Sequence, residues 1–203
     1  MNYLNIKNLS ISYEKVTVFN RFSHSFERGL HWIKGYNGSG KSTLLKALCG
    51  IIPVPENTVK VMGHDITTQA LKAKSTLCYV ADKPEVYPFM SGYQYLQLIT
   101  EIKGETLNQK LDSWLDEVKL TPFKDTPFSD MSFGTRRKFT LASCLIGEPD
   151  VILLDEPFNG LDDNTCEKLM QWLFEVKEDK CVLIASHNQP ITAQQFTSMI
   201  ELS

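Results

Sequence analysis

The stretch that decides the fold is GYNGSGKST, which runs from Gly35 to Thr43. It matches the phosphate-loop pattern GxxxxGK[ST], with Lys41 and Ser42 at the last two positions. The apolar segment Leu30 to Ile33 precedes it and reads as a short strand. The segment Ser42 to Gly50 follows it and has leucines at helical spacing. A strand, a glycine-rich turn and a helix in this order predict a phosphate-binding site.

The residue types in this loop suit a phosphate chain. Glycine lets backbone N–H groups point inward without a side-chain clash, and the start of the next helix favours an anion. Lys41 can reach the terminal phosphates, and Ser42 can bind Mg²⁺ with the hydroxyl of Thr43 nearby. The alternative is a plain turn with a solvated lysine. We expect a nucleoside triphosphate to be bound by the whole stretch: Gly35, Tyr36, Asn37, Gly38, Ser39, Gly40, Lys41, Ser42 and Thr43.

A second constellation lies in VILLDEP, from Val151 to Pro157. An apolar run this short fits a strand buried on both faces, so Asp155 would emerge at the carboxyl edge of a sheet. Asp155 can hold Mg²⁺ through water, and Glu156 can orient and deprotonate an attacking water. His187 follows the apolar strand CVLIA in the same way, and a contact to the γ-phosphate is expected. The alternative for the acids is a solvated strand end.

The rest of the chain alternates strands and helices, which favours an α/β fold with a mostly parallel sheet. Near-alternating apolar residues predict strands from Leu4 to Leu9 and from Val16 to Phe26, and a further strand pair around Val59 and Leu77 to Val80. A helix from about Asn164 to Lys177, the strand CVLIA, and a last short helix and strand complete the frame.

The middle of the chain is more helical. Ser91 is a plausible N-cap for a helix, and Leu107 to Val118 has amphipathic spacing. Ser132 opens a third helix that runs to about Ile146. The segment from roughly Pro84 to Phe128 therefore reads as a helical insertion, which together with the third helix gives a helical subdomain at about 84–145 within one domain of 1–203.

The third motif is MSFGTRRK, from Met131 to Lys138. Taken alone, it is an N-capped helix with a solvated basic turn. Together with the other motifs and their order, it resembles the signature LSGGQ of the ABC ATPase family, and the resemblance covers nearly the whole chain. The resemblance implies a phosphate-loop NTPase fold with an antiparallel β subdomain and a helical insertion. It also implies ATP and Mg²⁺ as cofactors.

Residue roles follow from that resemblance. Tyr13 resembles the aromatic side chain that stacks on adenine, and Gly35 to Thr43 is the Walker A loop. The further roles are the Walker B acid and the catalytic base at Asp155 and Glu156, the D-loop at Gly160, Leu161 and Asp162, the switch histidine at His187, and the signature at Ser132 and Gly134.

There are three departures from the family pattern. Phe133 stands where the first glycine of the signature usually is, and Thr135 where its glutamine usually is. We expect function to survive, because Ser132 keeps its hydroxyl and Gly134 still admits close backbone approach. Asp82 takes the place of the glutamine that usually binds Mg²⁺, and a carboxylate is a reasonable Mg²⁺ ligand.

The resemblance implies a head-to-tail dimer, in which the phosphate loop of one cassette and the signature of the other hold each ATP. A homodimer and a heterodimer are both allowed. The main hypothesis is the ATPase subunit of a membrane transporter whose membrane-spanning subunit is a separate chain. Aromatic and apolar residues after Asp82 would dock that subunit or pack in the core: Tyr87, Phe89, Met90, Tyr93 and Tyr95.

Two alternatives remain: a soluble ABC ATPase of DNA repair or ribosomes, and a phosphate-loop kinase of a small molecule. The net charge of −3 and the isoelectric point of about 5.8 give no global attraction to nucleic acid, so no nucleic-acid partner is expected. Five dispersed cysteines suggest reduced, structural thiols. With neither a signal peptide nor a membrane span in the sequence, we expect a location on the cytoplasmic face of the membrane. The motifs identify neither the cargo nor its direction of transport.

Overall fold

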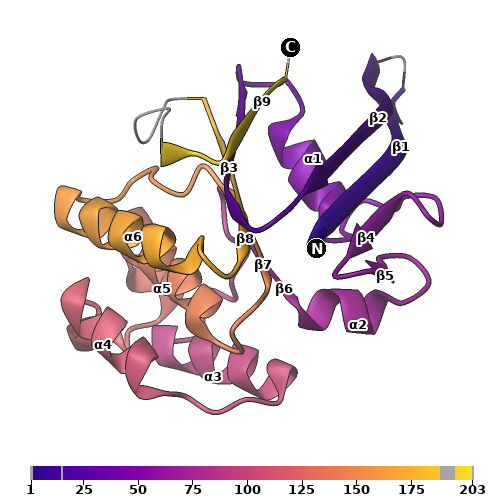
Figure 1. Cartoon of the computed structure of the whole chain (residues 1–203). Coiled ribbons are helices and arrows are strands. Elements are labelled where there is room, and N and C mark those ends of the chain that lie inside the picture. Colours follow the sequence, from indigo (N-terminus) through magenta and orange to yellow (C-terminus); the bar gives the residue numbers. More distant parts are fainter. Residues whose placement is uncertain (1, 15, 188–194, 203) are drawn as a thin grey trace.

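The computed structural model describes residues 2–14, 16–187 and 195–202. Two sheets and two groups of helices make up this part of the chain (Figure 1). The central sheet has the strand order β6-β7-β8-β3-β9, and all its pairings are parallel. Its strands are β3 (Gly29–Gly35), β6 (Leu77–Val80), β7 (Val151–Asp155), β8 (Cys181–Ser186) and β9 (Ser198–Leu202).

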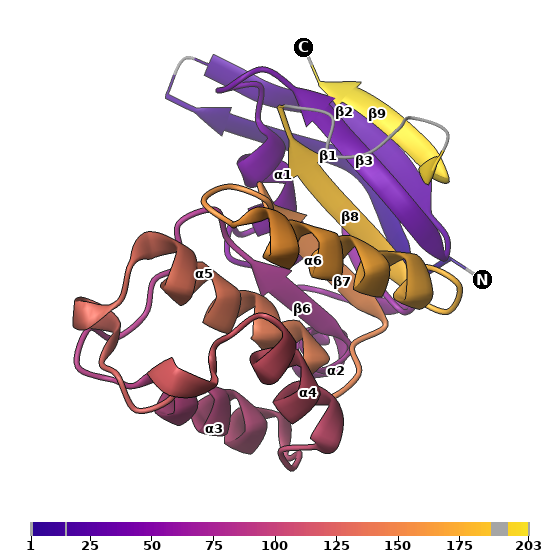
Figure 2. The same ribbon diagram turned by 90° about the vertical axis from the view of Figure 1, so that its left-hand side faces the viewer.

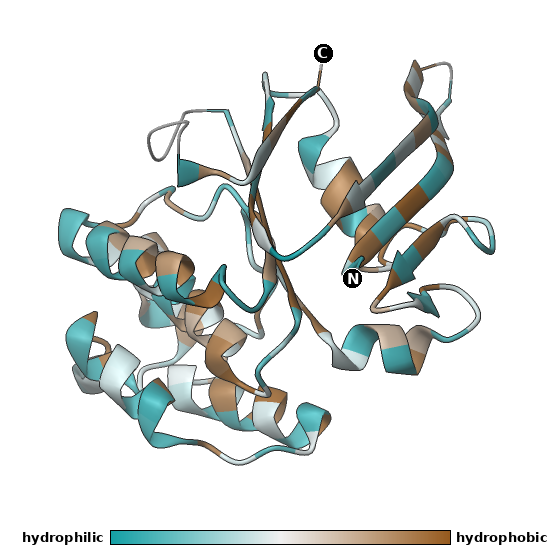
Figure 3. Ribbon diagram, in the orientation of Figure 1, coloured by the Kyte–Doolittle hydropathy of each residue, from teal (hydrophilic) through white to brown (hydrophobic). Residues whose placement is uncertain are grey.

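The second sheet is antiparallel and has the order β2-β1-β4-β5. Its strands are β1 (Leu4–Tyr13), β2 (Val16–Phe26), β4 (Val59–Val61) and β5 (His64–Asp65). Apolar and polar residues alternate along β1 and β2, as expected for a sheet with one solvated face (Figure 3). In the central sheet, β7 and β8 are instead apolar along most of their length and fully buried.

The helices lie on two sides of the central sheet (Figure 1). Between the two sheets lies α1 (Lys41–Leu48), and α2 (Ala70–Ser75) follows the antiparallel sheet. The helices on the opposite side are α3 (Gly92–Lys103), α4 (Gln109–Glu117), α5 (Phe133–Ala142) and α6 (Asp163–Val176). Three short 3₁₀ turns lie between them: η1 (Thr121–Phe123), η2 (Phe128–Asp130) and η3 (Ser143–Leu145). Figure 2 shows α3, α4 and α5 gathered beside β6 and β7.

Two hydrophobic cores meet at the central sheet. In β7, Ile152 and Leu154 belong to the core of the α3–α6 side, whereas Val151 and Leu153 belong to the core around α1 and the antiparallel sheet. Side chains alternate between the faces of a strand, so a strand covered on both faces is apolar throughout. The sheet is therefore held between two packed layers, which fixes its carboxyl edge in place.

Most of the expected elements are present. Ser91 caps α3 in a capping box with Gln94, as its position predicts. The expectation that the strands at Val59 and Leu77 pair with each other is wrong. In the structure β4 lies in the antiparallel sheet, and β6 is an edge strand of the parallel sheet. Alternation of apolar residues marks a strand but not its partner. Helix α2 was not expected, and the last short helix falls largely outside the described residues.

None of the described helices is long and apolar enough to cross a lipid bilayer. The described cysteines carry free thiols, as expected, and four of them are buried: Cys49, Cys78, Cys144 and Cys181.

Candidate functional site

The carboxyl ends of β3, β7 and β8 meet at one edge of the central sheet, because these strands run parallel. A cavity of about 320 Å³ lies at this edge. Four parts of the chain line it, namely the end of β1 with the start of β2, the phosphate loop with α1, the residues after β6, and the residue after β7. The lining residues are Tyr13, Val18, Asn37, Gly38, Gly40, Lys41, Ser42, Thr43, Asp82 and Glu156.

Two glycines of the loop are required by its backbone. Gly38 has φ of 87° and Gly40 has φ of 94°, both in the left-handed region that side chains disfavour. A Cβ at Gly40 would also lie 2.5 Å from Cγ1 of Val18. Gly40 is the N-cap of α1 and offers no side-chain cap to the first turn. The start of α1 therefore keeps backbone donors for an anion in the cavity.

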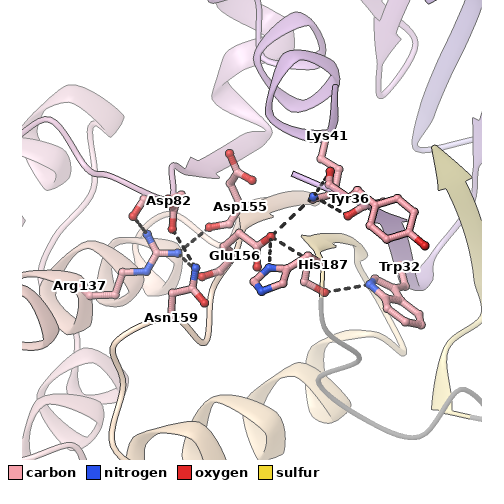
Figure 4. Close-up of polar contacts among 11 residues, drawn as sticks. Trp32, Tyr36, Lys41, Asp82, Arg137, Asp155, Glu156, Asn159 and His187 are labelled. Atoms are coloured by element: carbon pink, nitrogen blue, oxygen red, sulfur yellow. Dashed lines mark hydrogen bonds and ion pairs between the residues drawn. The ribbon is translucent and has the colours of Figure 1, made fainter. Parts of the chain in front are cut away.

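Lys41 is buried, and its ammonium is held by the loop itself (Figure 4). Its Nζ donates to the carbonyl oxygens of Gly35, at 2.7 Å, and of Tyr36, at 3.1 Å. The same Nζ lies 3.8 Å from Oε1 of Glu156. The ammonium of Lys41 therefore lies between the loop and Glu156. Its positive charge is available to bind phosphate oxygens.

Glu156 is fixed by a second contact, to the residue after β8. The backbone N–H and Nδ1 of His187 lie 3.0 and 2.9 Å from Oε1 of Glu156 (Figure 4). Glu156 has φ of 46°, a left-handed conformation, and its N–H donates to Ala185 in the neighbouring strand. The predicted base and the predicted switch histidine are therefore in direct contact.

Asp155 is the last residue of β7 and is 2% exposed. Burial raises the pKa of its carboxyl, as do the charges of Asp82 and Glu156, whereas a hydrogen bond from Ser42 and the charge of Arg137 lower it. Its Oδ1 is buried and has no hydrogen-bond partner in the described structure.

A buried carboxylate oxygen without a partner, next to a serine hydroxyl, fits a hard cation such as Mg²⁺. Among the described residues, no group of three or more His, Cys, Asp or Glu side chains is arranged to hold a metal ion by itself. A magnesium ion at this edge would therefore need oxygens from Ser42 and from the phosphates, which is the usual pattern for Mg²⁺ bound with a nucleotide.

Asp82 lines the same cavity, just after β6. Its Oδ1 accepts a hydrogen bond from Nδ2 of Asn159 at 3.2 Å. The pair joins the end of β6 to the turn after Glu156, so Asp82 has a partner in the protein as well as access to the cavity. Tyr13 also lines the cavity and is half exposed.

Within the described chain, Ser132 and Gly134 do not line this cavity. Ser132 is the N-cap of α5, and its Oγ accepts from the N–H of Thr135 at 3.1 Å. Gly134 is packed so tightly that a Cβ there would lie 2.5 Å from the carbonyl oxygen of Gly160. Phe133 lies over Gly160 as well. The predicted signature and D-loop thus touch each other, while the other predicted site residues gather at the phosphate loop.

The expectation of a solvated basic turn after Gly134 is wrong for Arg137, which is fully buried. Its guanidinium donates to four backbone carbonyl oxygens, those of Ala81, Asp82, Asp155 and Glu156. The sequence offered one signal, an arginine at a position of α5 that could face the sheet, but the pairing carbonyls only come together in the fold. Lys138 follows and forms an ion pair of 2.5 Å with Asp162.

Comparison with known proteins identifies the family. The model of the ABC transporter family matches residues 19–159, well over half of the chain. The chain belongs to the ABC transporter family. A solved structure described as an ATP-binding subunit of an ABC transporter superimposes with a TM-score of 0.89 at 23% identity, covering 98% of this chain and 85% of that one. The phosphate-loop NTPase fold expected from the motifs is confirmed.

Two curated proteins illustrate the range of relatives of this ABC family member. An uncharacterized ABC transporter ATP-binding protein, YhcH of Bacillus subtilis (strain 168), is 29% identical over 91% of this chain and 61% of its own length. The bacitracin transport ATP-binding protein BcrA of Enterococcus faecalis is 27% identical over 89% of this chain and 60% of its own length. The chain therefore spans about three fifths of the length of these two relatives.

Proposed function

We propose that this chain is the ATP-binding and ATP-hydrolysing subunit that powers an ABC-type membrane transporter. The observation that carries the proposal is the cavity at the sheet edge, where Lys41, Ser42, Asp82 and Glu156 converge from three separate motifs. Family membership and the name of the bacitracin relative support a role in transport.

Different residues of the site bind the adenine, the phosphates and Mg²⁺. Tyr13 stacks on the adenine, and the backbone donors from Gly38 to Thr43 surround the phosphates. Lys41 exchanges the carbonyls of Gly35 and Tyr36 for phosphate oxygens. Ser42 and Asp155, with Asp82, hold Mg²⁺. When bound, the ion neutralises negative charge on the phosphates.

The residues after β7 and β8 perform the hydrolysis. Glu156 orients and deprotonates the attacking water. His187 holds Oε1 of Glu156 through its backbone N–H and Nδ1, so the carboxylate has a fixed direction before nucleotide arrives. His187 also reaches the γ-phosphate once ATP is bound.

A second cassette completes the site. Ser132 and Gly134 lie at the start of α5 and, in the described structure, do not line the cavity of their own chain. A helix start with a serine hydroxyl suits an anion, so the signature of one copy contacts the ATP held by the phosphate loop of the other. ATP then stabilises the dimer, and hydrolysis releases it.

A separate membrane-spanning chain docks beside β6. Tyr87 is 60% exposed and Phe89 is 76% exposed, whereas Met90 and Tyr95 pack against the core. The predicted aromatic cluster is thus divided between surface and interior. A neighbouring groove of about 490 Å³ is lined mainly by apolar groups, and its lining includes Pro84, Val86, Pro88, Phe128 and Phe133. Exposed aromatic residues beside an apolar groove suit a partner helix.

Dimerisation tests the proposal. The Glu156→Gln variant, mixed with ATP and Mg²⁺, should become a dimer in sedimentation velocity experiments, because bound ATP is no longer hydrolysed. The Lys41→Ala, Glu156→Gln double variant should remain monomeric under the same conditions. A Glu156→Gln protein that binds ATP and yet stays monomeric at high concentration would contradict the dimer mechanism.

Docking is tested separately. The tagged chain, expressed in its native host, should co-purify with one integral membrane protein. Replacing Tyr87 and Phe89 together by serine should abolish the association while leaving ATP hydrolysis by the free chain intact. Stimulation of the ATPase by DNA or ribosomes, with no membrane partner captured, would favour a non-transport ATPase instead.

A further inference from the structure

Arg137 is the one buried arginine of the described chain and has no function in the mechanism above. It lies in α5, the helix that Ser132 begins, and its side chain reaches the carboxyl edge of the central sheet (Figure 4). We propose that Arg137 is a positioning residue for hydrolysis, which ties the signature helix to the strand ends that carry Glu156 and Asp82. This inference rests on the proposed ATPase function.

The contacts of the guanidinium join two strands. One nitrogen donates to Ala81 and, at 2.6 Å, to Asp82, the two residues after β6. The other donates at 2.5 Å to Asp155 and at 2.8 Å to Glu156, at the end of β7. All four acceptors are backbone carbonyls, so the contacts fix the path of the main chain and leave the carboxylates available for the cavity.

The fixed path matters most at Glu156. A left-handed φ of 46° is an unfavourable conformation for glutamate and persists only where the surroundings hold it. The N–H of Glu156 donates to Ala185 on one side, and its carbonyl accepts from Arg137 on the other. The N–H of Asn159 donates to the same carbonyl, so Arg137 supplies one of three hydrogen bonds that hold the backbone of Glu156.

The charge of Arg137 is balanced at a distance. Asp82, Asp155 and Glu156 are the negative groups around it, and they favour its charged form against the cost of burial. A planar guanidinium can place two nitrogens against two separate strand ends, whereas an ammonium is a single point. Lysine at this position would keep the charge but hold only one strand end.

Turnover and nucleotide binding separate this role from simple stability. In Arg137→Lys and Arg137→Gln, kcat should fall by about 10- to 100-fold, since a displacement on the order of 1 Å can cost that much. The affinity for nucleotide measured without Mg²⁺ should stay within about twofold, because the guanidinium hydrogen bonds go to the ends of β6 and β7 and not to the phosphate loop. The matched control is Phe139→Leu, a fully buried position on the same helix.

A double-mutant cycle then identifies the route of the effect. If Arg137 acts through Glu156, adding Arg137→Lys to Glu156→Gln should lower the residual turnover no further. Thermal unfolding should show comparable losses in Arg137→Lys and Phe139→Leu, with kcat reduced only in the former.

Three results would overturn the proposal. The first is an equal loss of kcat in the Phe139→Leu control, and the second is a full additional loss of turnover in the double variant. The third is unfolding of both Arg137 variants, which would give the residue a role in stability alone. The wild-type protein distinguishes these from failure of the proposed function, because a wild-type chain without ATPase activity would remove the function itself.

Discussion

The starts of α1 and α5 are both expected to meet phosphate, yet they are built in opposite ways. Helix α1 begins at Gly40, which provides no side-chain cap. Helix α5 begins at Ser132, whose Oγ already accepts from the N–H of Thr135 and lies 2.8 Å from the hydroxyl of that residue. The first start is open to a ligand and the second is satisfied internally. Only α1 is therefore ready to bind an anion without rearrangement.

This difference gives each half of the nucleotide site its own role. In the proposed mechanism the phosphate loop would bind ATP first, with backbone donors at the start of α1 that no side chain caps. The signature would join later, because Ser132 must first give up an internal hydrogen bond to contact ATP across a dimer. The order of events follows from which donors and acceptors are already paired.

Replacing Glu156, the predicted general base after β7, should change turnover more than any other substitution. Glu156→Gln should lower turnover by about 10²- to 10⁴-fold, since it removes a general base, while ATP binding persists. Steady-state phosphate release and nucleotide titration measure the two quantities. The exposed Glu167→Gln on α6 is the control, and a Glu156→Gln protein as active as that control would exclude Glu156 as the base.

The second-largest effect is expected for Lys41, whose ammonium lies in the half of the site formed by the phosphate loop and the start of α1. Lys41→Ala should weaken ATP binding by about 10- to 100-fold, because charge-assisted hydrogen bonds contribute roughly 1.5–3 kcal/mol. Isothermal titration calorimetry measures the affinity. Lys46→Ala, on the exposed face of α1, should bind as the wild type does. Unchanged affinity in Lys41→Ala would show that the phosphate loop and the start of α1 do not bind the phosphates.

A smaller change in turnover is expected for Ser132, the N-cap of α5. Ser132→Ala should cost about 1 kcal/mol of stability as a lost N-cap and lower turnover by about tenfold, because the hydroxyl also serves the second ATP contact. Ser91→Ala, which removes the equivalent cap of α3, should cost similar stability by urea unfolding with normal turnover. Equal turnover in the two variants would leave Ser132 with a structural role alone.

The smallest effect concerns how α5 is anchored. A hydrogen bond from Lys138, together with hydrogen bonds from Thr165, lowers the pKa of Asp162 to about 2, against an ordinary value of 3.8. The folded protein therefore gains stability from this carboxylate above pH 4 and loses it as the pH falls from about 4 to 2. Asp162→Asn keeps the cap of α6, so urea unfolding should show a deficit below about 1 kcal/mol at pH 5. That deficit should shrink as the pH falls from about 4 through 2, and a deficit independent of pH would contradict the assignment.

The open half could be predicted from the sequence because its chemistry is local. The spacing from Gly35 to Ser42 carries the loop, the helix start and the lysine together, and the apolar run of β7 with its two acids is equally compact. The fold class followed from the order of strands and helices. These features depend on neighbours in the chain.

The surroundings of α5 could not be predicted in the same way, because they depend on contacts between residues that are distant in the sequence. Nothing near Arg137 in the sequence shows that four carbonyls from β6 and β7 meet its guanidinium. The assignment of β4 and β6 to different sheets and the contact of Gly134 with Gly160 are also properties of the assembled fold. The roles of all the site residues toward nucleotide remain predictions: Tyr13, Gly35 to Thr43, Asp82, Ser132, Gly134, Asp155, Glu156 and His187.

The two carbonyls that hold Lys41 have a consequence for the end of each catalytic cycle. When product leaves, the ammonium returns to Gly35 and Tyr36 within its own loop, so departure of the nucleotide is offset by internal bonds that re-form at once. The loop without nucleotide therefore keeps two hydrogen-bond acceptors for its buried ammonium. A phosphate loop built in this way can regain its ligand-free arrangement before the next nucleotide binds.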